Sequence, residues 1–240
     1  MRYRKKRIIY ALILLLLLFF TACNSENQTE VKILNAEAEN EDSFNEKFQE
    51  QKDALEKFKA ILLEDGNFVS TDLDGQSLSI EDMWRVVTTD DSIAVNAVNF
   101  AVIDLDSDGQ SEVVLGIQAG GDPYYGFEVL QYRDEAVYGY TLPYRAFMNV
   151  KTDGTFHFSS GAADSGAGRL FLSETGYTIK EQVCSQSEYN SDNELTVQYY
   201  IDEMSCSEEE FHNAMDQQDQ KMDIKWYDFS TEAITTAFSR

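Results

Sequence analysis

The chain has 240 residues, of which 43 are acidic and 19 are lysine or arginine, so its net charge is −24. A surface of this sign repels phosphates, which excludes nucleic acid as a partner and favours divalent cations or basic partners. The two histidines, His157 and His212, fall in different predicted elements, which argues against a zinc site.

The first 22 residues have the pattern of a signal peptide. A basic segment, residues 2–7, precedes an unbroken apolar run of 13 residues from Ile8 to Phe20, shorter than the roughly 18 residues that a membrane-spanning helix needs. Phe20-Thr21-Ala22-Cys23 follows and resembles the lipobox of bacterial lipoproteins. The resemblance implies cleavage after Ala22 and attachment of palmitate-type acyl chains to Cys23, on the extracytoplasmic face of the cell membrane. An uncleaved anchor helix or an ordinary signal peptide would also place the remaining chain outside the cytoplasm.

Residues 23–42 are expected to be the lipidated cysteine and a flexible acidic tether. The stretch from Asn24 to Asp42 is polar and has no aromatic residue, so it cannot bury enough apolar surface to become ordered. Removal of residues 1–22 takes away five cations and no anion, which brings the net charge of the mature chain to about −29.

The ordered domain is predicted to begin with a helix at Ser43. Ser43 and Glu46 form a capping-box pattern, and apolar residues then recur at helical spacing as far as Leu62. A short helix is expected after Ser79, with Met83, Trp84 and Val87 directed inward.

Between residues 97 and 201 the apolar period changes to two, which predicts strands. The turn Asp153-Gly154 favours a β-hairpin, and the short spacing without helices favours an antiparallel meander. The predicted strands are residues 99–103, 112–117, 127–132, 136–142, 146–151, 155–160, 169–172, 177–183 and 195–201.

The C-terminal segment returns to helix. Ser205 and Ser207 each precede a glutamate by three positions and predict a helix start, residues 226–229 are predicted to be extended, and Ser230 is predicted to cap a last helix. Residues 43–240 are therefore predicted to form a single α+β domain, in which an antiparallel β-meander sheet packs on one face against N- and C-terminal helices.

One stretch carries a metal-binding pattern, Asp104-Leu-Asp106-Ser-Asp108-Gly-Gln110-Ser-Glu112. Ca²⁺ prefers six to eight oxygen ligands, and carboxylates at alternate positions of a tight loop can converge on one centre. Glycine at position 109 allows the chain to reverse. A polar turn with solvated aspartates is the alternative, although three like charges within five residues would destabilise such a turn without a counter-ion.

This pattern resembles the calcium loops of FG-GAP and VCBS-type repeats, and a set of bacterial lipoproteins in which one such loop joins two apolar strands of a helix-flanked domain. The resemblance implies Ca²⁺ ligands at Asp104, Asp106, Asp108, the carbonyl of Gln110, and Glu112. The single copy does not support a propeller, and the leucine at position 115 together with the flanking strands argues against an EF-hand. We expect a structural ion that holds the hairpin.

The remaining patterns are weaker. Cys184 and Cys206 permit one disulfide in an oxidising compartment, and whether they are bonded is left open. Asp72-Leu-Asp74-Gly75 and Asp164-Ser165-Gly166 are interpreted as ordinary loops.

Two functional hypotheses remain. The favoured one is a calcium-stabilised, non-catalytic module that binds an extracellular protein or glycan, with the predicted loop at residues 118–125 and the nearby tyrosines as its contact surface. The other is a cell-envelope hydrolase whose acidic catalytic residues the sequence does not single out.

Overall fold

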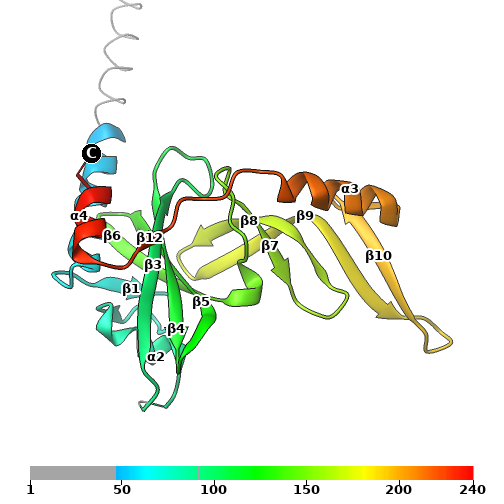
Figure 1. Cartoon of the computed structure of the whole chain (residues 1–240), viewed down its shortest axis with the longest axis horizontal. Helices are drawn as coiled ribbons and strands as arrows, with labels where there is room; N and C mark the ends of the chain where they lie inside the picture. The colour runs from blue at the N-terminus through cyan, green and yellow to red at the C-terminus, as the bar shows by residue number, and fades with distance from the viewer. Residues whose placement is uncertain (1–46, 91, 240) are drawn as a thin grey trace, which may run out of the picture. The chain divides into compact units, whose positions relative to one another are not determined.

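The computed structural model describes residues 47–90 and 92–239 of the chain (Figure 1). The predicted signal peptide, Cys23, the predicted acidic tether and the predicted helix start at Ser43 lie outside the described residues. Within the described part, no helix is both long and apolar enough to cross a membrane.

The first sheet has seven strands in the order β12-β3-β4-β5-β6-β1-β2. All neighbours are antiparallel except β1 and β6, which are parallel. The strands β3 to β6 form a meander, as the sequence predicted. The bounds are β1 Phe68–Ser70, β2 Ser77–Leu78, β3 Val95–Ile103, β4 Glu112–Ala119, β5 Asp122–Arg133, β6 Ala136–Pro143 and β12 Tyr227–Asp228.

A second sheet of five antiparallel strands follows, in the order β11-β10-β9-β8-β7. The strands therefore form two sheets, where the sequence predicted one. The bounds are β7 Thr155–Ser159, β8 Ser165–Ser173, β9 Gly176–Tyr189, β10 Leu195–Ile201 and β11 Met204–Cys206.

The break between the sheets lies where a strand was predicted over residues 146–151, and that prediction is wrong. A 3-10 helix, η2 (Tyr144–Ala146), ends there, and Asn149 has a φ of 51°, a left-handed conformation that a regular strand cannot contain. Met148 and Lys151 make only isolated bridges, to His157 and Asp223.

In the described part of the chain, four α-helices and two 3-10 helices accompany the sheets. The described part of the first helix covers residues 47–62. The expected short helix is present as η1 (Glu81–Met83) and α2 (Trp84–Val87); Met83 and Val87 are buried, whereas Trp84 is exposed, contrary to the prediction.

Both C-terminal helices begin at serines that the sequence indicated, Ser207 and Ser230, whereas Ser205, the other predicted helix start, lies in β11. The Ser207 side chain accepts from the Glu210 amide in a full capping box at the start of α3 (Glu208–Asp219). Ser230 caps α4 (Thr231–Ala237) by accepting from the amide of Ala233.

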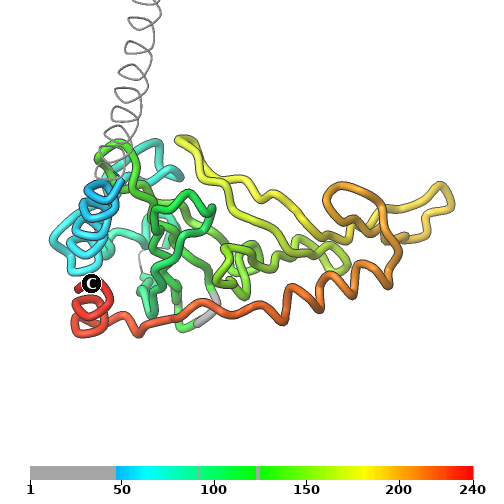
Figure 2. The backbone as a smooth tube through the Cα atoms, turned by 90° about the horizontal axis from the view of Figure 1, so that it is seen from above, coloured from blue at the N-terminus to red at the C-terminus, as the bar shows by residue number. Residues whose placement is uncertain are grey.

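The first sheet is buried on both faces. On one face, Phe58 and Leu62 of the first helix and Ile234 of α4 pack against β3, β4 and β5, and Figure 2 shows these two helices side by side. On the other face, residues of β3 to β6 pack against Phe156 and Leu170 of the second sheet. The predicted α+β class, with terminal helices on one face of the sheet, is confirmed; α3 instead covers the second sheet, where Phe211 contacts Tyr199.

Candidate metal centre

The predicted metal loop joins β3 and β4, which are neighbouring antiparallel strands of the first sheet. Ile103 pairs with Glu112 at the base of the hairpin, and residues 104–111 form the loop. Leu105 is 1% exposed and belongs to the core between the sheets, so the loop is anchored by an apolar side chain at its second position. This anchor holds the neighbouring aspartates near the surface.

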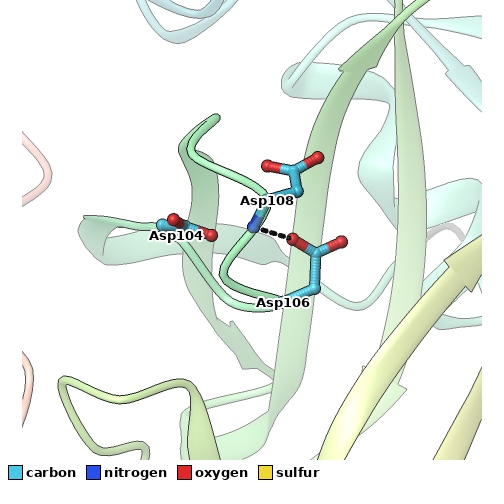
Figure 3. A group of neighbouring side chains, drawn as sticks. All are labelled: Asp104, Asp106 and Asp108. Carbon is cyan, nitrogen blue, oxygen red and sulfur yellow. Dashed lines mark hydrogen bonds between the residues drawn. The ribbon is translucent and has the colours of Figure 1, made fainter.

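Three carboxylates gather in this loop (Figure 3). One oxygen from each of Asp104, Asp106 and Asp108 lies within 4.8 Å of the others. Ligand oxygens about 2.3–2.6 Å from a shared Ca²⁺ are at most about 5 Å apart, so the three oxygens fit one ion. The group can hold a metal ion.

The loop is shaped by its own backbone amides. Asp104 accepts from the amides of Ser107 and Gly109, at 2.7 and 3.1 Å. The amide of Asp108 donates to Asp106 at 3.1 Å, the bond drawn in Figure 3, and the amide of Gln110 donates to Asp108 at 2.7 Å. These bonds orient the carboxylates before any ion binds.

Two residues of the loop have a positive φ. Gly109 has a φ of 93°, which explains the glycine at this position. Ser107 has a φ of 67°, a conformation uncommon for residues other than glycine. The backbone is therefore left-handed on both sides of Asp108.

The acidic groups disfavour one another's charge. Burial raises the pKa of Asp106, and the nearby carboxylates of Asp108 and Asp104 raise it further. Burial also raises the pKa of Glu112 to about 8, with smaller contributions from the same three aspartates. A bound dication would reverse this balance because it favours the ionised carboxylates.

Three of the five predicted ligands are thus brought together. Glu112 is 2% exposed, and its Oε2 accepts from the backbone amide of Leu105 at 2.8 Å. This hydrogen bond joins the two ends of the loop. Glu112 is not one of the three residues whose oxygens converge. Gln110 follows the cluster in the sequence, and its backbone N–H donates to the Asp108 carboxylate.

The cysteines are free thiols in this structure. Cys184 on β9 pairs with Tyr200, and Cys206 on β11 pairs with Tyr199, so β10 lies between them. Strands two apart are about 9.6 Å apart, beyond the roughly 7 Å that a disulfide spans. Burial, and then the Glu181 carboxylate, raise the pKa of Cys184 to about 12, so this thiol is not a nucleophile at neutral pH.

The weaker sequence candidates have structural roles. Asp72 accepts from the amide of Thr141 at 3.0 Å, and Asp164 accepts from the amide of Ser187. The segment from residue 118 to 125 is not the loop that the sequence predicted: β4 continues to Ala119, β5 starts at Asp122, and only Gly120 and Gly121 turn the chain.

Sequence analysis missed one ionisable group, Glu128 on β5. Its side chain is fully buried, and one oxygen accepts from the Thr141 hydroxyl at 2.7 Å while Oε1 has no partner. Burial raises the pKa of Glu128 to about 8, and the Asp72 carboxylate adds to the shift. In the sequence, the only indication of this buried acid was a glutamate within the apolar stretch predicted to be a strand, residues 127–132.

Comparison of the chain with protein-family models, with curated proteins and with solved structures finds no match.

Proposed function

We propose that this chain is a lipoprotein, anchored through Cys23 on the extracytoplasmic face of the membrane, whose domain is a calcium-stabilised, non-catalytic binding module for an extracellular protein or glycan. The observation that supports the metal most strongly is the convergence of Asp104, Asp106 and Asp108 within one loop. The signal-peptide pattern and Cys23 support the location.

Calcium is favoured over other metals by the chemistry of the donors. All three converging side chains offer hard carboxylate oxygens, and no histidine or cysteine belongs to the group. Such a set suits Ca²⁺, Mg²⁺ or Mn²⁺ rather than Zn²⁺. Extracellular calcium modules bind at about 10⁻⁴–10⁻³ M, a range that suits a structural ion outside the cell.

The position of the loop favours a structural role. A Cβ atom on Gly154 would lie 2.1 Å from the carbonyl oxygen of Leu105, so the turn before β7 packs directly on the metal loop. Leu105 itself lies in the core between the sheets. An ion that fixes this loop therefore also fixes the place where the second sheet begins.

The hydrolase alternative is not favoured by the strongly shifted carboxyls. Glycoside hydrolysis uses two carboxyl groups roughly 5–10 Å apart that flank one bond. Glu112 pairs with Ile103, which faces the second sheet, whereas Glu128 pairs with Leu115, which faces the terminal helices. Paired residues share a face of the sheet, so these two glutamates point to opposite faces.

Thermal unfolding with and without calcium tests the proposal. At about 5 mM Ca²⁺, the affinity range above corresponds to about 1–2 kcal/mol of stabilisation, which should raise Tm by about 3–6 °C over a sample in chelator. The double variant Asp106→Asn/Asp108→Asn should lose this difference.

Asp74→Asn is the matched control, because Asp74 is an exposed aspartate in the Asp-Gly turn that echoes the motif. This variant should keep the full calcium response. Equal melting temperatures of the unaltered chain in calcium and in chelator would refute the proposal.

A further inference from the structure

A cavity of about 330 Å³ opens on the first sheet, away from the metal loop. Its base is formed by β3, β4 and β5, and its sides by residues 144–150 and by the segment 223–226 that leads to β12. The volume is at the lower end of the roughly 300–1,000 Å³ typical of small-molecule sites.

One wall of the cavity consists of aromatic rings. Phe127 lies between Tyr144 and Trp226, with ring centroids 5.9 and 6.1 Å away and interplanar angles of 20° and 28°. Trp226 is 36% exposed and Phe127 is 8% exposed, so the indole is the accessible end of this wall. The three rings are stacked with nearly parallel planes, so the exposed indole of Trp226 is the aromatic surface that a ligand can reach.

Apart from the aromatic wall, the cavity is lined by two valines, two glycines and three polar side chains, which are two neutral amides and one carboxylate. A Cβ atom on Gly116 would lie 2.1 Å from Oδ1 of Asn99, so the glycine leaves space for this amide to lie across the sheet. The Oδ1 atom is buried and has no hydrogen-bond partner. Asn149 is exposed, and Asp223 accepts from Lys151 Nζ at 2.6 Å.

We infer that this cavity binds a neutral saccharide unit of a glycan. An aromatic plane packs against the C–H face of a sugar ring, and amide and carboxylate groups match hydroxyls, which both donate and accept. No lysine or arginine lines the cavity, and the acidic surface repels anionic sugars and phosphates. An apolar peptide side chain would offer no hydrogen bond to the amides of Asn99 and Asn149, whereas sugar hydroxyls can both donate and accept.

This inference rests on the proposed binding function and names the ligand class. The cavity is independent of the metal loop, because Asn99 precedes Ile103 by four positions, about 13 Å along the strand. Loss of saccharide binding and loss of the calcium response are therefore separable.

The chain contains two tryptophans, which provides both a reporter and a matched control. Trp84 is 37% exposed, close to the 36% of Trp226, but it lies on α2 and does not line the cavity. In the Trp84→Ala variant, Trp226 is the single tryptophan, and its fluorescence should change when a saccharide binds.

The experiment uses the full-length lipoprotein in a detergent without a sugar headgroup. Binding is titrated with neutral oligosaccharides, in one arm oligomers of N-acetylglucosamine and in another unmodified hexose oligomers, which distinguishes wall-type glycan from external polysaccharide. Polygalacturonate and phenylalanine-rich peptides form two further arms. We expect saturable binding in one neutral arm, about tenfold weaker in Trp226→Ala, retained in Trp84→Ala and largely restored in Trp226→Tyr.

Absence of binding in both neutral arms would overturn the inference, as would equal affinity of Trp226→Ala and the unaltered chain. Binding of the peptide or of polygalacturonate alone would also overturn it. The calcium-dependent rise in Tm, measured on the same samples, shows whether the proposed metal function stands in each case.

Discussion

At the scale of single residues, Glu128 is one of two glutamates whose pKa burial raises to about 8, the other being Glu112. Glu128 lies between Leu115 and Thr141 in the middle of a sheet that is covered on both faces. Only the Thr141 hydroxyl stabilises the carboxylate, and no cation pairs with it among the interactions of the described residues. Folding therefore favours the protonated acid.

This predicts a direction for the pH dependence of stability. Between about pH 4.5, where an unfolded glutamate ionises, and the folded pKa of about 8, the native chain keeps a proton that the unfolded chain has lost. The free energy of unfolding should therefore fall as pH rises through this window, by about 2–4 kcal/mol from Glu128.

Denaturant unfolding from pH 4.5 to 8.5 measures this dependence. Glu128→Gln should make the fall in stability smaller, with the contribution of Glu112 remaining, whereas Glu174→Gln, at an exposed glutamate in the turn between β8 and β9, should not change it. A slope that is the same in Glu128→Gln and the unaltered chain would show that Glu128 ionises normally.

At the scale of elements, the turn before β7 is held by its contact with the metal loop. Gly154 has a φ of 79°, and its α-carbon lies so near the Leu105 carbonyl that no side chain fits. Gly75 has nearly the same φ, 77°, with no atom closer than 4.0 Å to an added Cβ. Alanine substitutions at Gly75 and Gly154 therefore separate the effect of the positive φ on stability from the effect of packing against the loop.

Gly75→Ala should lower the free energy of unfolding by about 1 kcal/mol, the cost of a side chain at positive φ. Gly154→Ala should lower it by about 2–4 kcal/mol, because the metal loop or the turn must also move. Chemical denaturation of the two variants measures the difference. Equal losses would mean that the contact between loop and turn contributes nothing.

The elements also show which features a sequence can predict. The strands of the meander were predictable because valine, isoleucine, tyrosine and phenylalanine recur with period two. Periodicity does not reveal which strands pair, so the division into two sheets at Asn149 was not predictable. Strands of two or three residues, such as β1 and β2, are too short to produce a pattern, although β12 lies within the segment 226–229 that was predicted to be extended.

The same reasoning applies to the two sites. The aspartate cluster was predictable because all its residues lie within five positions, so local geometry brings them together. The cavity joins residues from positions 98 to 226 and exists only once the sheet has formed. Glu128 was missed because its burial depends on layers that cover both faces of β5.

At the scale of the whole molecule, the surface charge determines how much of the proposed membrane attachment must come from the lipid anchor. A net charge of about −29 on the proposed mature chain would repel anionic headgroups, so in this proposal attachment depends on the lipid at Cys23 and not on electrostatic attraction. Two or more acyl chains give stable anchoring, because each buried methylene contributes about 0.8 kcal/mol.

Cys23→Ser should therefore move the exported chain from the membrane fraction to the soluble fraction. Fractionation followed by mass spectrometry of the N-terminal peptide measures this change. Cys184→Ser, at a cysteine in the folded domain, is the control and should leave the chain in the membrane fraction. A Cys23→Ser chain that remains in the membrane fraction would indicate a different anchor.

The central claim is that the loop from Asp104 to Glu112 binds calcium. Titration of the ¹⁵N-labelled mature chain with CaCl₂, followed by ¹H–¹⁵N correlation spectra, tests it most directly. Saturable shifts should be largest at the amides of Ser107, Gly109 and Gln110, and Asp106→Asn/Asp108→Asn should abolish them. Amide signals of residues 104–112 that stay unchanged up to about 10 mM calcium, well above the affinity range of extracellular sites, would contradict the account.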